Sequence, residues 1–104
     1  MFNDTYKEIK NPTTGLHKEK GSRFISYLFS VYSEQEVKER LEEVKKIEHS
    51  ARHHCYAYII NPDKSLQRAN DDGEPSSTAG KPILGQIRSN DLTNILIIVV
   101  RYFG

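Results

Sequence analysis

Six consecutive apolar residues at positions 95–100, Ile-Leu-Ile-Ile-Val-Val, constrain the fold of this chain more than any other stretch. The run continues into Arg101, Tyr102 and Phe103, and it is far shorter than the roughly 20 residues that a membrane-spanning helix needs. An uninterrupted run of β-branched and aliphatic side chains is typical of a strand buried on both faces. We therefore predict that residues 95–103 form the central strand of a sheet.

Other segments also have the features of strands. Residues 22–29 alternate in polarity, and residues 66–69 are typical of a short strand that pairs back on its predecessor. Residues 5–9 are a weaker candidate, and residues 11–21 have the composition of a turn followed by a solvated link.

Residues 52–60 form the strand with the clearest alternation. It places His53, Cys55, Ala57 and Ile59 on one face, and His54, Tyr56, Tyr58 and Ile60 on the other. The first set is small and apolar, which suits a face that helices cover.

Two helices complete the predicted fold. Ser33 and Glu36 form a capping box, and apolar side chains follow at helical spacing at Val37, Leu41, Val44 and Ile47. A second helix carries Ile83, Leu84 and Ile87 inward. We predict a single α/β domain of the α+β two-layer sandwich type, in which two helices lie on one face of a mixed sheet of four to five strands.

Length and composition describe an ordinary soluble domain. The chain has 104 residues, 37% of them hydrophobic, and a net charge of +1, which argues against a general charge-driven nucleic-acid or membrane binder but allows a local basic patch. Cys55 is the only cysteine, so no internal disulfide can form. The first residues lack the features of a signal peptide. We expect a cytoplasmic protein that needs no cofactor and contacts no membrane.

The segment from Arg68 to Leu84 holds most of the polar chemistry. It contains three carboxylates, three hydroxyls and one lysine: Asp71, Asp72, Glu74, Ser76, Ser77, Thr78 and Lys81. Residues 72–75, Asp-Gly-Glu-Pro, are typical of a tight turn, and one of the hydroxyls is expected to cap the second helix. The amides of that helix N-terminus, together with Lys81, would suit an anion or a small ligand. Alternatively, the hydroxyls only cap the helix, and the carboxylates lie at the surface of the turn without binding a ligand.

An enzyme is one functional alternative. His53, His54 and Cys55, next to the carboxylates of Asp71, Asp72 and Glu74, could supply the base, nucleophile or metal ligands of a hydrolase. Their spacing matches no catalytic or metal motif, and adjacent side chains on a strand face opposite ways. We therefore assign no catalytic and no metal-binding residue.

A binding module is the favoured alternative. Arg52 and His54 begin a strand whose same face carries Tyr56 and Tyr58, a combination on which RNA bases could stack. Further anion contacts would come from Lys81, Arg101 and the helix N-terminus near Thr78. The simpler interpretation is that the tyrosines only cover the face of the sheet.

A structural role for the polar segment is compatible with binding. Here Asp71 or Asp72 would pair with Arg52, Arg68 or Arg101 and pin the segment over the end of the sheet.

Several motifs, taken together, resemble one known family. They are Lys-Gly-Ser-Arg-Phe-Ile at 20–25, Ala-Arg-His-His-Cys-Tyr-Ala-Tyr at 51–58, Asn-Asp-Asp-Gly-Glu-Pro-Ser at 70–76, Thr-Ala-Gly-Lys-Pro-Ile-Leu at 78–84 and Val-Val-Arg-Tyr-Phe-Gly at 99–104. In this order they are similar to the amino-terminal domain of the IMPACT/YigZ family.

The resemblance implies a fold like domain 2 of ribosomal protein S5. It also implies a role in translation, with RNA, the ribosome, a translation factor or another protein as the partner and no demonstrated catalysis. The family pattern continues beyond residue 104 and adds a second domain similar to domain IV of elongation factor G. We accordingly expect residues 1–104 to be one domain, incomplete at its carboxyl end.

Overall fold

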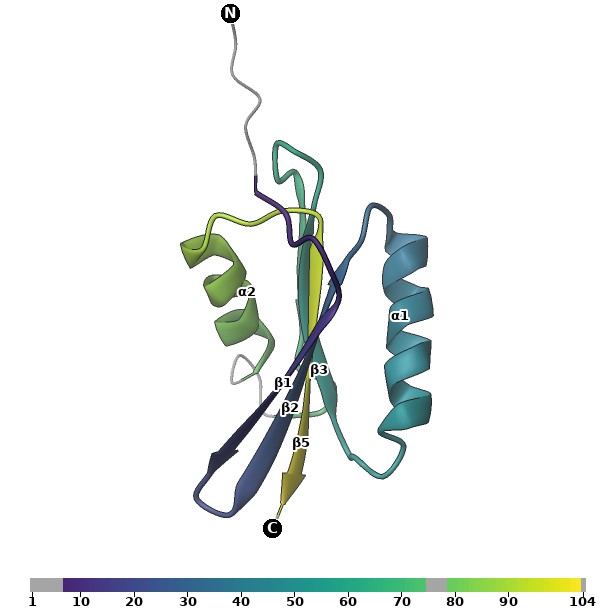
Figure 1. Cartoon of the computed structure of the whole chain (residues 1–104), viewed down its shortest axis with the longest axis vertical. Helices are drawn as coiled ribbons and strands as arrows, with labels where there is room; N and C mark the ends of the chain where they lie inside the picture. Colours follow the sequence, from purple (N-terminus) through teal and green to yellow (C-terminus); the bar gives the residue numbers. More distant parts are fainter. Residues whose placement is uncertain (1–6, 75–78, 104) are drawn as a thin grey trace, which may run out of the picture.

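The computed structural model describes residues 7–74 and 79–103 (Figure 1). Along the chain the elements are β1 (Thr13–Glu19), β2 (Ser22–Ser30), α1 (Glu34–Ile47), β3 (His54–Ile60), β4 (Leu66–Asn70), α2 (Gly80–Ser89) and β5 (Ile95–Phe103). Within the described ranges no helix has both the length and the hydrophobicity needed to cross a bilayer.

The strands form one five-stranded sheet in the order β1-β2-β5-β3-β4. β5 is the central strand, as its apolar run predicts, and Ile95, Leu96, Ile98 and Val100 are fully buried. All neighbouring strands are antiparallel, so the prediction of a mixed sheet is wrong. The reason is the position of β5. β2 and β3 run in the same direction, as a helical crossover requires, but β5 lies between them and is antiparallel to both.

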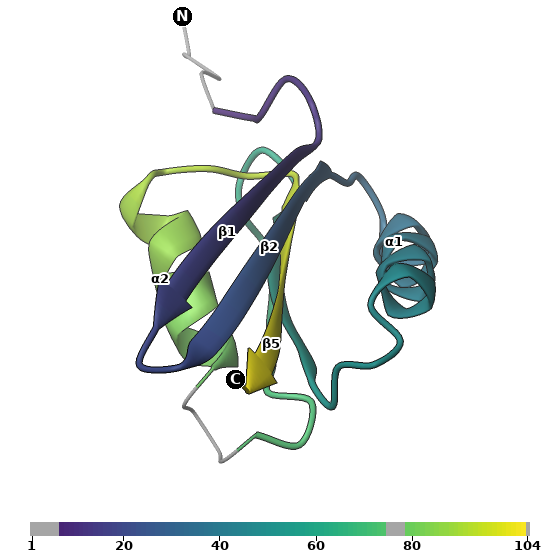
Figure 2. The same cartoon turned by 60° about the horizontal axis from the view of Figure 1, so that its bottom comes forward.

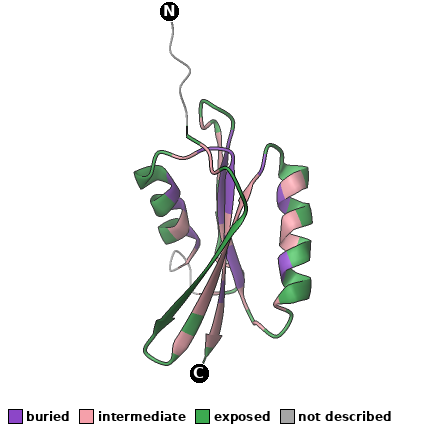
Figure 3. Ribbon diagram, viewed as in Figure 1, coloured by how far each residue is buried: buried purple, intermediate pink, exposed green. Residues whose placement is uncertain are grey.

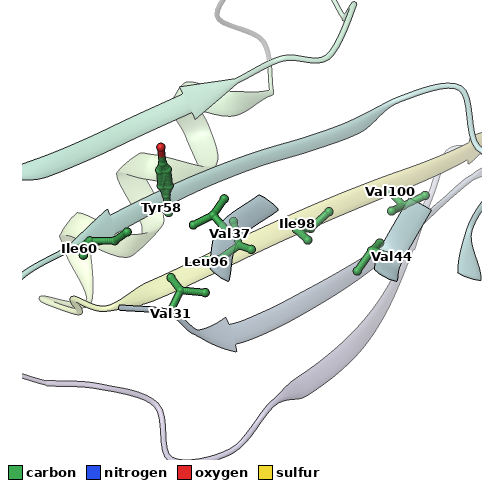
Figure 4. Close-up of a cluster of buried hydrophobic side chains, with 8 residues drawn as sticks. All are labelled: Val31, Val37, Val44, Tyr58, Ile60, Leu96, Ile98 and Val100. Carbon is green, nitrogen blue, oxygen red and sulfur yellow. The ribbon is translucent and has the colours of Figure 1, made fainter. Parts of the chain in front are cut away.

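The two helices lie on opposite faces of the sheet, not on one face as predicted (Figures 1 and 2). Val37 and Val44 of α1 pack on the face that includes Tyr58 and Ile98 (Figure 4). On the other face, α2 packs with Leu84 and Ile87 on the cluster of Ala57, Ile59 and Ile95. Since β5 is apolar on both faces, each face needs its own cover, and the buried residues follow the middle of the sheet (Figure 3). The α+β class, with one sheet and two helices, is confirmed.

The capping box of α1 is confirmed in its main contact. Ser33 Oγ accepts a hydrogen bond from the Glu36 amide at 3.2 Å, whereas the Glu36 carboxylate accepts from the Tyr32 amide instead of the Ser33 amide.

The strand candidate at residues 5–9 lies partly outside the described residues, and Lys7 makes only an isolated bridge to Leu92. The link expected at residues 11–21 contains β1, whose seven residues are all exposed.

Glu48 fastens the end of α1 to the sheet. Its carboxylate accepts hydrogen bonds from the hydroxyl of Tyr102, at 2.5 Å, and from that of Tyr27. Burial alone would raise the pKa of this carboxyl, but the two hydrogen bonds and the charges of Arg23 and His54 outweigh it and hold the pKa below its ordinary value of 4.5. Burial and the same contact raise the pKa of Tyr27 to about 12.

The depressed pKa of Glu48 predicts a loss of stability in acid. In the unfolded chain the carboxyl takes up its proton near pH 4.5, while in the folded chain it stays ionised to lower pH. Its contribution is therefore complete above about pH 4.5 and is lost as the pH falls through the folded-state pKa. Glu48→Gln should lower the melting temperature at neutral pH and flatten its decline in acid. The exposed Glu42 of α1 supplies the control, because Glu42→Gln should keep the wild-type pH profile. Parallel profiles for Glu48→Gln and wild type would contradict the prediction.

Candidate functional site

The described parts of the five sequence motifs, which we call the signature segments, meet at one end of the sheet, where β3 begins and β5 ends. Arg101 of β5 pairs with Phe24 of β2, and Val100 pairs with His54 of β3. We call this region, which contains Arg23, Arg52, Arg101, Tyr102 and Phe103, the Arg101 end. The segment from Asn70 to Glu74 and the first turn of α2 lie against it.

Asp71 caps α2. Its Oδ1 accepts hydrogen bonds from the amides of Ala79 and Gly80, at 3.1 and 2.6 Å, and the N-cap residue Ala79 has no side-chain cap of its own. Ser76, Ser77 and Thr78, the predicted caps and anion contacts, lie outside the described residues. The two amides are therefore not free for an external anion, because a carboxylate of the chain already occupies them.

Gly80 allows this arrangement because α2 begins against the end of β4. A Cβ at position 80 would lie 2.7 Å from the backbone nitrogen of Asn70 and 2.9 Å from its carbonyl carbon. Any larger residue would push the helix away from the strand, and the bonds from Asp71 would lengthen with it.

A tight turn spans residues 71–74, one residue earlier than the predicted 72–75, and Pro75 lies outside the described residues. The amide of Glu74 donates to the Asp71 carbonyl at 3.0 Å, and Gly73 has a φ of +88°. The Asp72 carboxylate accepts from the backbone amide of His54 at 2.6 Å, while the Asp72 carbonyl lies 2.6 Å from Nδ1 of His53. The turn is thus fixed to the start of β3 from both its side chain and its backbone.

Glu74 forms the ion pair that holds the turn to β5. Its Oε1 lies 2.8 Å from Nη2 of Arg101, and its Oε2 accepts from the same nitrogen at 3.0 Å. Among the described residues, the arginine–carboxylate ion pair that pins the segment is made by Glu74 with Arg101, whereas the prediction named Asp71 or Asp72 as the carboxylate. Arg68 donates instead to the Gln67 carbonyl, and Arg52 makes no ion pair within the described residues.

Cys55 and the two histidines serve as hydrogen-bonding groups of the fold. The buried Cys55 thiol donates to the Asp71 carbonyl at 3.2 Å, and burial, with the charges of Glu74, Asp72 and Asp71, raises its pKa to about 11. Nε2 of His54 lies 3.0 Å from the carbonyl oxygen of Glu48. Among the described residues, no group of three or more His, Cys, Asp or Glu side chains is placed to hold a metal ion.

The predicted stacking surface of Arg52, His54, Tyr56 and Tyr58 is not an open platform, because α1 packs on that face. Tyr58 is only 6% exposed and donates to Glu34 of α1 at 2.6 Å, while Tyr56 lies beside it with ring centroids 6.4 Å apart. His54 is buried as well. Of this set only Arg52 is exposed.

The exposed aromatic group of this region is one that the sequence analysis did not select. Phe103 is 62% exposed, and the guanidinium of Arg101 lies 4.3 Å from its ring centroid. Arg23 lies in the same way 4.9 Å from the ring of Tyr102. A pocket of about 330 Å³ beside them is lined by Arg52, Arg101 and Phe103. This grouping follows from the pairing of Arg23 with Tyr102 between β2 and β5. The sequence alone does not give that register, because the two residues are far apart in the chain.

A second, smaller pocket lies on the α2 face. It measures about 180 Å³ and is lined by Phe24, Cys55, Glu74, Ala79, Ile83, Val99 and Arg101. We call it the Glu74 pocket. Each of the signature segments contributes at least one residue to its wall.

The capping role of Asp71 predicts a measurable loss of stability. Asp71→Ala removes the acceptor of two helix amides and should lower the free energy of unfolding by about 0.5–2 kcal/mol, while Asp71→Asn, which keeps one oxygen, should lose less. Urea denaturation measures the loss, and hydrogen exchange of the Ala79 and Gly80 amides locates it. Glu42→Ala, at an exposed position of α1, is the control and should change stability by less than about 0.5 kcal/mol. Equal midpoints for Asp71→Ala and Glu42→Ala would rule the capping role out.

The chain is similar to known proteins over most of its length. The Impact N-terminal domain model matches residues 20–104. IMPACT family member YvyE of Bacillus subtilis is 46% identical over 83 residues, which are 80% of this chain and 38% of the relative. IMPACT family member YigZ of Escherichia coli is 41% identical over 95 residues, or 89% of this chain and 47% of the relative.

Two solved structures share the fold. The crystal structure of a hypothetical protein superposes with a TM-score of 0.85 and 38% identity, covering 89% of this chain and 46% of that one. The two-domain translational regulator Yih1 superposes with a TM-score of 0.71 and 26% identity, covering 99% of this chain and 42% of that one. The chain thus spans less than half the length of these relatives. On the match of residues 20–104 and on these identities, it belongs to the IMPACT family.

Proposed function

We propose that this chain is a regulatory domain of translation that binds RNA, free or within the ribosome, through the Arg101 end of its sheet. The observation that carries the proposal is the structural match, across 99% of the chain, to a protein described as a two-domain translational regulator. The charge and the aromatic groups of the Arg101 end support RNA as the partner.

The Arg101 end exposes several cations. Five basic side chains there are exposed and make no ion pair within residues 7–74 and 79–103, namely Lys18, Lys20, Arg23, Arg52 and Lys81. Two carboxylates of this end are engaged in the fold, since Asp71 caps α2 and Glu74 pairs with Arg101, while Glu19 is exposed beside Lys18 and Lys20. A chain of net charge +1 therefore presents a local basic surface, which attracts phosphate groups.

Exposed ring and guanidinium planes lie within the same surface. Phe103 and Arg101 offer a stacked pair at the end of β5, and Arg23 lies over Tyr102 on the neighbouring strand. Unpaired bases of single-stranded RNA stack on aromatic rings and on guanidinium planes. Tyr56, under α1, is not part of this surface.

The proposal predicts a salt-dependent affinity for single-stranded RNA. We would measure the fluorescence anisotropy of a labelled oligonucleotide with the full-length protein at several salt concentrations. The double variant Arg52→Ala, Lys81→Ala should bind more weakly, and the slope of log K against log salt should become shallower by about 0.7 for each lost phosphate contact. Lys10→Ala, Lys38→Ala removes the same charge from exposed positions away from the Arg101 end and should bind as wild type does.

Crosslinking in cell lysate, with and without nuclease, distinguishes an RNA from a protein partner. RNA adducts that disappear in the Arg52→Ala, Lys81→Ala variant support the proposal. Protein adducts that survive nuclease and disappear in the same variant would instead make this surface a protein interface. Equal RNA affinity for the two double variants would contradict a role for the Arg101 end.

A further inference from the structure

The Glu74 pocket combines an apolar wall with one ion pair. Phe24, Ile83 and Val99 supply the apolar side chains, and the Cys55 thiol is already committed to the Asp71 carbonyl. Its volume of about 180 Å³ is below the roughly 300–1,000 Å³ of pockets for drug-sized ligands, so it suits a single small group. The pocket shares Arg101 with the surface proposed to bind RNA.

The hydrogen-bonding groups of the ion pair are only partly used. Both carboxylate oxygens of Glu74 contact the same nitrogen, Nη2 of Arg101, which leaves each oxygen with capacity to accept another hydrogen bond. Glu74 is 9% exposed, so water reaches little of that capacity. Nε of Arg101 is buried and has no acceptor among the described residues. A buried donor without an acceptor is rare in native proteins, so Arg101 has unused capacity to donate a hydrogen bond.

We propose that the Glu74 pocket binds one guanine base of single-stranded RNA, an inference that rests on the proposed function. The Watson–Crick edge of guanine presents one acceptor, O6, followed by two donors, N1–H and the N2 amino group. Arg101 would donate to O6, and the Glu74 carboxylate would accept from both donors. The apolar wall would contact the flat faces of the base.

The other bases match this pair of groups less well. Adenine offers the carboxylate a single donor, its N6 amino group. Uracil places a carbonyl oxygen on each side of its one donor, so one of them would face the carboxylate. Cytosine has two adjacent acceptors and one donor. Guanine alone directs two adjacent donors to Glu74 while it keeps an acceptor for Arg101.

The test compares RNA oligonucleotides that differ only at one central base. With wild-type protein, the oligonucleotide with central guanine should bind about 5- to 150-fold more tightly than the one with central adenine or uracil. Inosine, which lacks only the N2 amino group, should be intermediate. Glu74→Gln should abolish the preference, whereas Glu39→Gln, on the exposed side of α1, should preserve it. Because the comparison of bases uses wild-type protein, it holds even if Glu74→Gln fails to fold.

The outcomes separate this inference from the proposed function. Equal affinity for all four central bases would overturn the guanine pocket and leave RNA binding intact. If no oligonucleotide binds, the proposed function fails, and a titration with free guanosine then tests the pocket alone. Saturable shifts of the Cys55, Val99 and Arg101 amide resonances with guanosine but not adenosine would support the pocket, and their absence would overturn it.

Discussion

The fold at the candidate site depends on one carboxylate, that of Asp71. Its side chain accepts the first amides of α2, and its backbone carbonyl accepts from the Cys55 thiol and the Glu74 amide. One residue therefore connects α2, β3 and the turn. With Asp71 fixed, Asp72 reaches the backbone of His54 and Glu74 reaches Arg101. These charged hydrogen bonds, made where water is partly excluded, are stronger than neutral ones, and they hold a segment that has no regular structure of its own.

The central position of β5 decides which surfaces remain for a partner. Because its apolar side chains point to both faces, each face is closed by one helix. The middle of the sheet is thereby unavailable, although tyrosines on β3 gave it the composition of a recognition surface. Recognition must use an edge or an end. The Arg101 end, against which the first turn of α2 lies, is the place at which polar groups and pockets coincide.

The sequence predicts those parts of the structure that leave a local pattern. The run of β5, the capping box of α1 and the positive φ of Gly73 each follow from a few neighbouring residues. β1 leaves no such pattern, since all of its side chains are exposed and only pairing with β2 makes it a strand. The sequence predicts both helices on one face, because the small, apolar side chains of β3 suit a face that helices cover, whereas Tyr58 on the other face is also buried, with its hydroxyl satisfied by Glu34. Likewise, three carboxylates stand close together in the sequence, and only the turn geometry selects Glu74 as the partner of Arg101.

The near-zero net charge conceals a separation of roles between acidic and basic residues. At the Arg101 end the carboxylates of Asp71, Glu48 and Glu74 accept hydrogen bonds within the fold, and their negative charge is directed inward. The basic side chains have no comparable internal partners: Arg52 makes no ion pair among the described residues, and Arg23 lies over an aromatic ring. The exposed charge at this end is therefore mostly basic, although Glu19 is exposed between Lys18 and Lys20. Composition alone hides this, because a balanced total is compatible with any spatial distribution, and it is the distribution that determines which ligands are attracted.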